Sequence, residues 1–345
     1  MRQVSRILRG TSRALLCALL LPLSAEASEE ESVTIATASP AGVYHTVGRA
    51  ICRAVDFPCR AEPSDGSVAN LDNIRHGAAT LGLAQSDSQH FAVSGTGAFR
   101  DAGPDSELRS VFSLHSEPFT LVVRRDAGIQ SLDDITQHAV NIGNPGSGQH
   151  GTMLRLMETR GWRHSDFRLV NELPADQQSM ELCHGNIDAM VYTVGHPNAS
   201  VAQAIRLCNA ALIDVTGEAV DRLVEETPYF TRAWIAGGLY GPDQPAVRTF
   251  GVRATLVASA QADPDMIYRL VAGVFENLLR FKATHPALGM LSTQEMIHEG
   301  LSAPLHEGAL RYYRERGWLP EAGMAAQGPA RGARRLASAS HGADD

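Results

Sequence analysis

The sequence has 345 residues and a formal net charge of −8, from 30 basic and 38 acidic side chains. This balance argues against a nucleic-acid partner, because binding would bring an acidic chain against phosphates. Lys282 is the only lysine, which nearly excludes Schiff-base catalysis and phosphate-binding loops that end in Gly-Lys-Ser/Thr.

The first 27 residues have the pattern of a cleaved secretory signal peptide. Four arginines flank the start of an apolar run at residues 14–23, and Ala25-Glu26-Ala27 supplies the small residues that signal peptidases accept. The run is shorter than the roughly 20 residues of a membrane-spanning helix. Cleavage after Ala27 removes four arginines and one glutamate, which leaves 26 basic and 37 acidic side chains and a net charge of −11. The sequence therefore predicts an exported, periplasmic chain.

Short strand-like runs alternate with amphipathic helical stretches from residue 32 onward. In the first part the periodicity predicts strands at residues 32–37, 59–62 and 81–84 and helices at 42–55 and 68–76. In the middle part it predicts strands at 119–123, 139–143, 167–170 and 187–192 and helices at 151–160 and 177–184. A β-rich stretch at 244–258, a long helix at 265–284 and a short helix ending near Arg314 follow. This βαβα order predicts an α/β fold with a parallel sheet and helices on its faces.

The length of the chain and the composition of its C-terminal part predict how many domains it has and where the last one ends. Cleavage after Ala27 leaves 318 of the 345 residues, enough for two domains at about 100–200 residues each. After Trp318 the sequence becomes a low-complexity mixture of Ala, Gly, Arg and Ser with little apolar material to bury. This composition predicts a disordered tail at residues 319–345.

Four cysteines remain after cleavage, an even number in an oxidising compartment: Cys52, Cys59, Cys183 and Cys208. Three pairings are possible. Cys52–Cys59 and Cys183–Cys208 are favoured, because near neighbours joined by a turn can meet at the Cα separation of about 5.5 Å that a disulfide needs. Four buried free thiols are the alternative, and the spacing does not suggest a zinc site.

Three loops share one design, in which a strand ends, small or polar residues follow and a helix begins. They are Ser39-Pro-Ala-Gly-Val-Tyr44, Asp65-Gly-Ser-Val-Ala-Asn70 and Asn144-Pro-Gly-Ser-Gly-Gln149. The first amides of a helix have no intrahelical partner and the dipole is positive there, so such a start attracts an anion without an arginine. Taken singly, each loop is more commonly an ordinary N-cap. The three together favour an anion-binding site.

Patterns typical of catalysis are weak. Gly146-Ser-Gly-Gln-His-Gly151 fits the dinucleotide pattern G-x-G-x-x-G, but it lies in mid-chain, whereas a Rossmann unit places it after the first strand. His298-Glu299 and His306-Glu307 lack the second histidine of a zinc protease, and no G-x-S-x-G nucleophile elbow occurs. The sequence therefore indicates no catalytic residues, no metal and no cofactor.

Further polar residues stand at or near predicted strands. Ser86-Asp87 follows the strand at 81–84, and Asp188 and Tyr192 lie on the strand after Gly185. Each side chain is suited to bond a ligand's ammonium or hydroxyl group from a cleft. Each is equally suited to a structural cap or turn.

An ordered set of motifs runs through the chain. The motifs are Gly-Val-Tyr44, Asp65-Gly-Ser-Val-Ala-Asn-Leu71, Ala84-Gln-Ser-Asp87, Asn141-Ile-Gly-Asn-Pro-Gly-Ser-Gly148, Gly185-Asn-Ile-Asp-Ala189, Gly195-His-Pro197 and Ala303-Pro-Leu-His-Glu-Gly-Ala309 with Tyr312-Tyr313. In this order they resemble the TAXI-type solute receptors of tripartite ATP-independent periplasmic (TRAP) transporters. The likeness covers residues 33–317, and the ordered set is far more specific than any single motif.

The resemblance implies a type II periplasmic-binding-protein fold, with two α/β lobes that are joined by a hinge and close on a ligand. The first lobe is expected at residues 28–116 plus 233–318, and the second lobe at 117–232. The resemblance also implies delivery of glutamate, glutamine, 2-oxoglutarate or a similar acid to a sodium-driven TRAP membrane permease. A monomer is the default expectation. A periplasmic ligand sensor, an ABC-type binding protein and, less favoured, a periplasmic hydrolase are the alternatives.

Carried over position by position, the resemblance implies ligand contacts at Tyr44, Ser67, Asn70, Ser86, Asp87, Ser147, Gly148, Gln149, Asp188 and Tyr192. The cysteine pairs 52/59 and 183/208 also look like those of close relatives. Two departures bear on the ligand. Pro40-Ala41 and His45 stand where relatives have Thr-Gly and often a second tyrosine, and Asp65 stands where glycine is usual. Asp65 adds negative charge near the expected anion site, and either departure shifts the expected ligand toward a zwitterion or a neutral amide.

Overall fold

The computed structural model of the chain describes residues 32–320. The predicted signal peptide lies outside the described residues, as does the predicted tail from residue 321 onward. Among the helices of residues 32–320, none is both long enough and apolar enough to cross a membrane.

The first region of the fold alternates strands with helices, as the periodicity predicts. Its elements are β1 (Val33–Ala36), α1 (Val43–Cys52), β2 (Cys59–Glu62), α2 (Ser67–Arg75), β3 (Leu81–Gln85) and α3 (Ser86–Ser94). Strand β1 pairs in parallel with both β2 and β3, which confirms the βαβα order of this region. The predicted parallel sheet is wrong for the sheet as a whole, because a later strand, β10 (Val247–Ser259), pairs antiparallel with β3. Helix α3 begins directly after β3, so Ser86 and Asp87 are helical residues and not part of an open loop.

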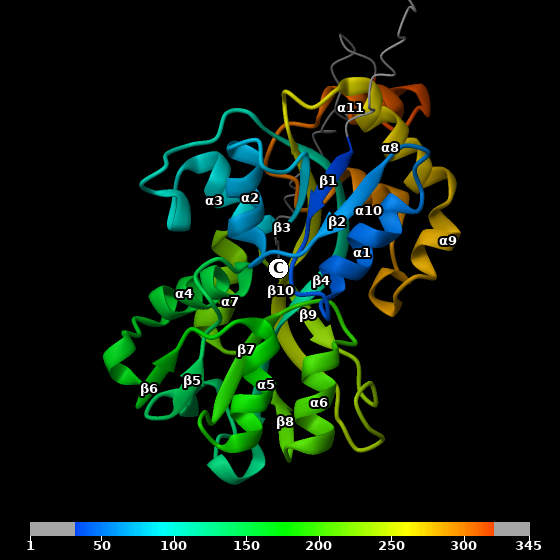
Figure 1. The fold of residues 1–345 in the computed structure, drawn as a ribbon. Helices are drawn as coiled ribbons and strands as arrows, with labels where there is room; N and C mark the ends of the chain where they lie inside the picture. The colour runs from blue at the N-terminus through cyan, green and yellow to red at the C-terminus, as the bar shows by residue number, and fades with distance from the viewer. Residues whose placement is uncertain (1–31, 321–345) are drawn as a thin grey trace, which may run out of the picture. The chain divides into compact units, whose positions relative to one another are not determined.

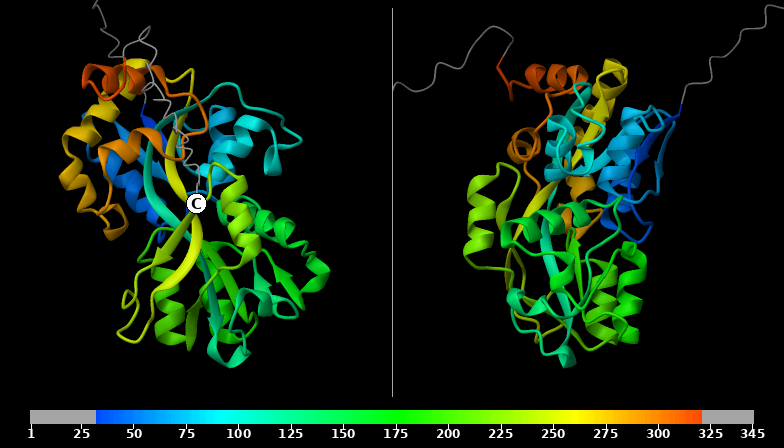
Figure 2. Two further views of the ribbon diagram at one scale, coloured as in Figure 1. Left: turned by 180° about the vertical axis from the view of Figure 1, so that it is seen from behind. Right: turned by 90° about the vertical axis from the view of Figure 1, so that its left-hand side faces the viewer.

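Two long antiparallel strands connect this region to the rest of the chain. They are β4 (Leu108–Arg124) and β10 (Val247–Ser259), and Figure 2 shows them running side by side between the two regions. The sheet order is β2-β1-β3-β10-β4-β7-β5-β6, with β8 paired to β4 and β9 paired to β10. The sequence predicted only residues 119–123 of β4. Its first half was missed because a mixed run of polar and apolar residues has no clear alternation.

The second region contains the middle of the chain. Its elements are β5 (Ala139–Asn141), α4 (Gly148–Arg160), β6 (Leu169–Asn171), α5 (Ala175–His184), β7 (Ala189–Thr193), α6 (Ala199–Leu207), β8 (Ala210–Ile213), α7 (Glu218–Glu226) and β9 (Thr231–Ile235). Strand β5 pairs in parallel with β6 and β7, whereas β7 and β8 each run antiparallel to β4. In Figure 1 these elements lie together below the first region.

The C-terminal helices return to the first region, beside β1 to β3 (Figure 1). They are α8 (Pro264–Glu276), α9 (Leu278–Lys282), α10 (Thr293–His298) and α11 (Glu307–Glu315). The prediction of a single helix at 265–284 is therefore wrong, because two helices, α8 and α9, occupy this stretch. Asn277 interrupts it with φ −109° and ψ 26°, and the Asn277 side-chain amide donates to the carbonyl of Gly273. Short 3-10 helices lie in other connections: η1 (Gly97–Phe99), η2 (Arg125–Ala127), η3 (Leu132–Ile135), η4 (His164–Asp166) and η5 (Pro286–Leu288).

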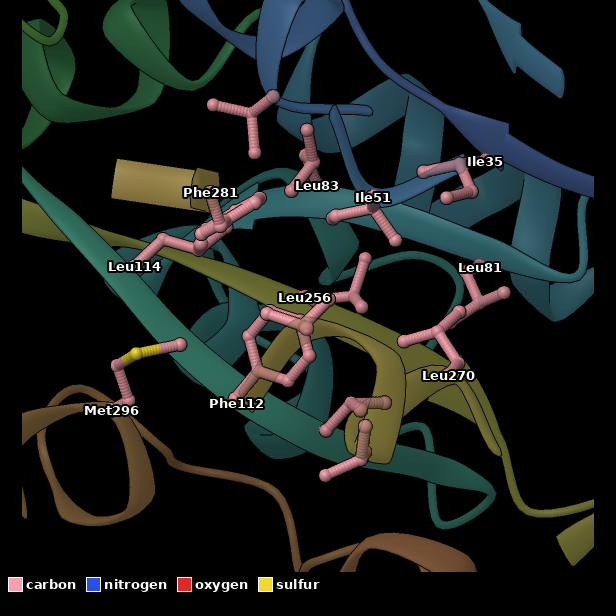
Figure 3. Packing of buried hydrophobic residues seen from close by; sticks show 14 of the residues in the cluster. Ile35, Ile51, Leu81, Leu83, Phe112, Leu114, Leu256, Leu270, Phe281 and Met296 are labelled. Carbon is pink, nitrogen blue, oxygen red and sulfur yellow. The ribbon is translucent and has the colours of Figure 1, made fainter. Parts of the chain in front are cut away.

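A large apolar core fixes α1 and α8 to one face of the sheet. Figure 3 shows Leu83 of β3, Phe112 of β4 and Leu256 of β10 packed with Ile51 of α1 and Leu270 of α8. All five are buried, and burial of such a side chain contributes about 1.5–3 kcal/mol. This packing holds the first turn of α1 at the end of β1.

Both favoured disulfides are present, which contradicts the alternative of four free thiols. Cys52–Cys59 has a Cα separation of 5.1 Å and joins the end of α1 to the start of β2. Cys183–Cys208 has a Cα separation of 4.7 Å and joins the last turn of α5 to the residue that follows α6. The first bridge therefore fixes the C-terminal end of α1 against β2, and the second fixes the C-terminal ends of α5 and α6 against each other.

Candidate ligand-binding site

A pocket of about 460 Å³ lies where strands of both regions end. Its lining comes from the segments after β1, β2, β5, β6 and β7, together with the last residue of β3, the last two residues of β7 and one residue of β4. Small-molecule sites usually have volumes of about 300–1,000 Å³, so the pocket suits a metabolite. The lining residues are 38–44, 63–67, 85, 117, 144, 147–149, 174–177, 192–194, 198 and 200.

Five helices begin at this pocket, namely α1, α2, α4, α5 and α6. Their N-cap residues all line it: Gly42, Gly66, Ser147, Pro174 and Asn198. In α1, α2 and α5 no side chain caps the first turn, whereas Ser147 and Asn198 cap their own helices. Unpaired first-turn amides and the positive ends of the helix dipoles therefore converge on one space. Such a space attracts an anionic group.

The charged side chains of the lining are negative, whereas the ends of the helix dipoles that meet there are positive. Among the described residues that line the pocket, none is arginine, lysine or histidine, whereas Asp65, Glu117 and Asp176 are acidic. Glu117 is 1% exposed and accepts a hydrogen bond of 2.8 Å from the Tyr44 hydroxyl. Burial, followed by the charge of Glu117, raises the pKa of Tyr44 well above its ordinary value. The phenol therefore stays a donor.

Two polar side-chain atoms in the lining are buried without a partner among the described residues. They are the amide nitrogen of Gln149 and the hydroxyl of Thr193, and their residues are 6% and 5% exposed. Buried polar groups are nearly always hydrogen-bonded, because an unpaired one costs about 1–3 kcal/mol. Both atoms lie in the pocket wall without exposed surface, so a solute pairs with them only if its binding moves these side chains.

The helix starts of the two regions touch each other beside the pocket. The Asn144 side-chain amide donates to the Asp65 carbonyl at 3.3 Å, and the Ala69 amide donates to the Gly146 carbonyl at 3.2 Å. Gly66 has φ +120°, and a Cβ atom there would lie 3.1 Å from the Cα of Ser147. Glycine at position 66 thus permits both the backbone conformation and the close approach.

A buried polar network lies behind the pocket and also joins the regions. The Thr152 hydroxyl of α4 donates to Asp87 of α3 at 2.7 Å, and the Gln85 side-chain amide donates to the Thr193 carbonyl at 3.0 Å. Burial raises the pKa of Asp87 to about 6. The Ser86 hydroxyl donates to the Tyr229 carbonyl at 3.2 Å and accepts from a backbone amide of β10. Ser86 and Asp87 therefore bind protein groups.

Of the ten ligand contacts that the resemblance implies, the structure places six in the pocket lining and four outside it. Six line the pocket: Tyr44, Ser67, Ser147, Gly148, Gln149 and Tyr192. Asn70, Ser86 and Asp87 are buried behind the lining, and the Asn70 amide donates to the carbonyls of Thr37 and Leu83. Asp188 lies outside the pocket, where it accepts hydrogen bonds from the Ala139 amide and Arg168.

Several lining side chains were not among the sequence candidates: Gln85, Glu117, Asp176, Thr193 and Asn198. Gln85 stands inside the motif Ala84-Gln-Ser-Asp87, so its position was available from the sequence. Glu117 is a carboxylate flanked by strand residues that are otherwise largely buried, and this charge in a buried strand is the signal that points to it.

Comparison with known proteins supports one fold. A family model described as the NMT1-like family matches residues 35–317. MatC from Rhodopseudomonas palustris, solved with bound malate, has a TM-score of 0.52 and 16% identity over 75% of this chain and 88% of that chain. The periplasmic binding protein BugD has a TM-score of 0.51 and 14% identity over 83% of this chain and 93% of that chain. The predicted two-lobed α/β periplasmic-binding-protein fold is thereby confirmed.

Proposed function

The chain belongs to the NMT1-like family, and on that premise we propose that it is an extracytoplasmic solute-binding protein for a small carboxylate metabolite. Glutamate, glutamine and 2-oxoglutarate are the proposed ligands. The observation that carries the proposal is the convergence of five helix starts on one pocket whose described lining has no basic side chain. MatC, a protein of similar fold solved with malate, supports a carboxylate as the ligand class.

We propose that the ligand bridges two lobes. In the first lobe, Tyr44 and the start of α2 at Ser67 face the pocket; in the second lobe, Gly148 and Gln149 do. A ligand that bonds to both sides stabilises the closed state, and only its differential affinity for the two states drives closure. The contacts between residues 65–69 and 144–146 are those of such a closed state.

The proposed hinge lies where β4 and β10 pass between the lobes. There Ser116 pairs with Arg253 and Pro118 with Gly251, next to a register shift in β10. The sequence suggested a return to the first lobe at residue 233. That residue lies in β9, which pairs with β10 before the crossing, so we place the return at residues 251–253.

We further propose that the protein acts in the periplasm as a TAXI-type receptor that delivers its ligand to a TRAP membrane permease. The ordered motifs that line the pocket support this subtype, because they supply the loops at Tyr44, 65–71 and 141–148. A hydrolase is disfavoured by a specific contact: the Ser86 hydroxyl is buried and bonded to two protein groups outside the pocket lining.

The test is thermal unfolding of ligand-stripped protein against dicarboxylates, 2-oxoacids and acidic or amide amino acids. A ligand at 100 times its dissociation constant adds about 2.7 kcal/mol to the free energy of unfolding and moves the midpoint by several degrees. The expected result is a selective shift for one ligand class. A flat response across the panel would reject the proposed ligands.

A further inference from the structure

Glu117 is a carboxylate buried in the pocket wall on a strand that otherwise packs the core. It lies on β4 opposite Val252 of β10, two residues before Phe119, whose partner across the ladder is Thr193. Its side chain is 2% exposed, and the residue lines the pocket. A carboxylate removed from water needs a donor or a positive charge, since the desolvation cost is otherwise several kcal/mol.

Only one of the two oxygens of this carboxylate accepts a hydrogen bond from the protein. One oxygen, Oε2, accepts from the Tyr44 hydroxyl at 2.8 Å. The other, Oε1, lies 3.5 Å from Nε2 of His115, which is longer than the roughly 2.7–2.9 Å of a charge-assisted hydrogen bond. Among residues 32–320 no other side chain or amide donates to the carboxylate of Glu117. Oε1 is therefore free to accept from a group in the pocket.

The charges around Glu117 favour a cation there. The described lining residues include no arginine, lysine or histidine, while Asp65 and Asp176 add two more carboxylates. Behind the lining, the Asp87 carboxyl and the His115 ring are buried, and His115 faces Oε1 of Glu117 at 3.5 Å. The helix starts meanwhile supply amide donors for a carboxylate. A pocket with both features matches a zwitterion, because the helix starts attract its carboxylate and the Glu117 carboxylate attracts its ammonium group.

We propose that Glu117 binds a cationic amino group of the ligand, so that the pocket takes an amino acid in preference to the corresponding dicarboxylate or 2-oxoacid. This inference rests on the proposed function and narrows its ligand class. Glu117 is then the specificity-determining residue, because it distinguishes an ammonium group from an oxo group or a hydrogen atom at the same carbon.

The test is calorimetric titration of the ligand-stripped full chain, purified from the periplasm, with matched compounds. L-glutamate is compared with glutarate and 2-oxoglutarate, L-aspartate with succinate and oxaloacetate, and L-glutamine with glutaramate, the same molecule without its α-amino group. The wild-type protein should bind at least one amino acid roughly tenfold or more tighter than its matched acids. Equal or tighter binding of the matched acids overturns the inference and leaves the proposed function intact. Binding of no compound overturns both.

The variant Glu117→Gln keeps the shape of the side chain and an acceptor for Tyr44 but removes the charge. It should weaken amino-acid binding roughly 10- to 100-fold, as expected for a lost hydrogen bond to a charged group, and leave binding of the matched acids unchanged or tighter. Glu225→Gln removes the same charge from an exposed site on α7 and should change neither. Unchanged amino-acid affinity in Glu117→Gln overturns the inference. The wild-type comparison stands even if this variant does not fold.

Discussion

The pocket has two walls that recognise a ligand in different ways. The helix-start wall, made of residues 39–44, 65–67, 147–149, 174–176, 198 and 200, offers backbone amides beside small residues. The strand wall, made of Gln85, Glu117 and Thr193, offers side chains of the strands β3, β4 and β7. Backbone donors attract any carboxylate, whereas the side chains of the strand wall differ in charge and shape. By our proposals, affinity for the anion thus arises at the helix-start wall and selectivity at the strand wall.

Removing the Cys183–Cys208 bridge should lower the free energy of unfolding more than any other change considered. It should also disturb the helix-start wall and so weaken ligand binding. The bridge joins the far ends of α5 and α6, whose first turns line the pocket. Replacing both cysteines by serine should lower the free energy of unfolding by about 3 kcal/mol, as expected for a loop of this length. Urea unfolding with and without ligand measures this. If stability falls but ligand affinity does not, the bridge does not position the wall.

The buried carboxyl of Asp87, behind the strand wall, should make stability depend on pH. Its folded pKa of about 6 is above the ordinary value of 3.8, so the folded state holds the proton more tightly than the unfolded state. Stability therefore falls as the pH rises from about 4 to about 6, by up to roughly 3 kcal/mol. Asp87→Asn should remove this dependence and raise the melting temperature at pH 7. A pH profile identical to that of the wild type would contradict the assignment.

Gly66 tests how closely the two lobes approach at the helix-start wall. An alanine there must adopt φ +120° and place its Cβ about 3.1 Å from Ser147, so Gly66→Ala should cost about 1–3 kcal/mol. Gly103→Ala is the matched control, since it has φ +71° and no atom within 4 Å of the added Cβ. Both variants lose stability through the backbone, but only Gly66→Ala should also weaken ligand binding, by roughly tenfold. Equal affinities would show that residues 66 and 147 do not meet in the bound state.

Thr193→Val should produce the smallest change in ligand affinity. It tests the strand wall alone, because Thr193 belongs to that wall. The Thr193 hydroxyl is buried without a partner among the described residues, so replacing it by a methyl group should leave ligand-free stability unchanged or slightly higher. Ligand affinity should fall by about 3- to 10-fold, since a neutral hydrogen bond contributes about 0.5–1.5 kcal/mol. Melting temperature and calorimetry measure the two quantities. Lower stability without ligand would indicate a structural role.

The sequence predicted the helix-start wall better than the strand wall, for a physical reason. Glycine, serine and proline before a helical period are local signals, so the loops ending at Tyr44, Asn70 and Gln149 could be found without knowing the fold. Glu117 and Thr193 meet only because β4 pairs with β7 across more than 70 residues of sequence. Asp188 illustrates the reverse: its motif was visible, but strand pairing places it beside Ala139 and Arg168, away from the pocket.

Hydrogen–deuterium exchange of the protein with and without a saturating carboxylate ligand tests the central claim most directly, namely that helix-start amides hold the ligand. Protection on binding should concentrate in peptides that cover residues 43–45, 67–69 and 147–149, with smaller changes along β4 and β10. Saturating binding that leaves these three segments unprotected would contradict the account and place the ligand elsewhere.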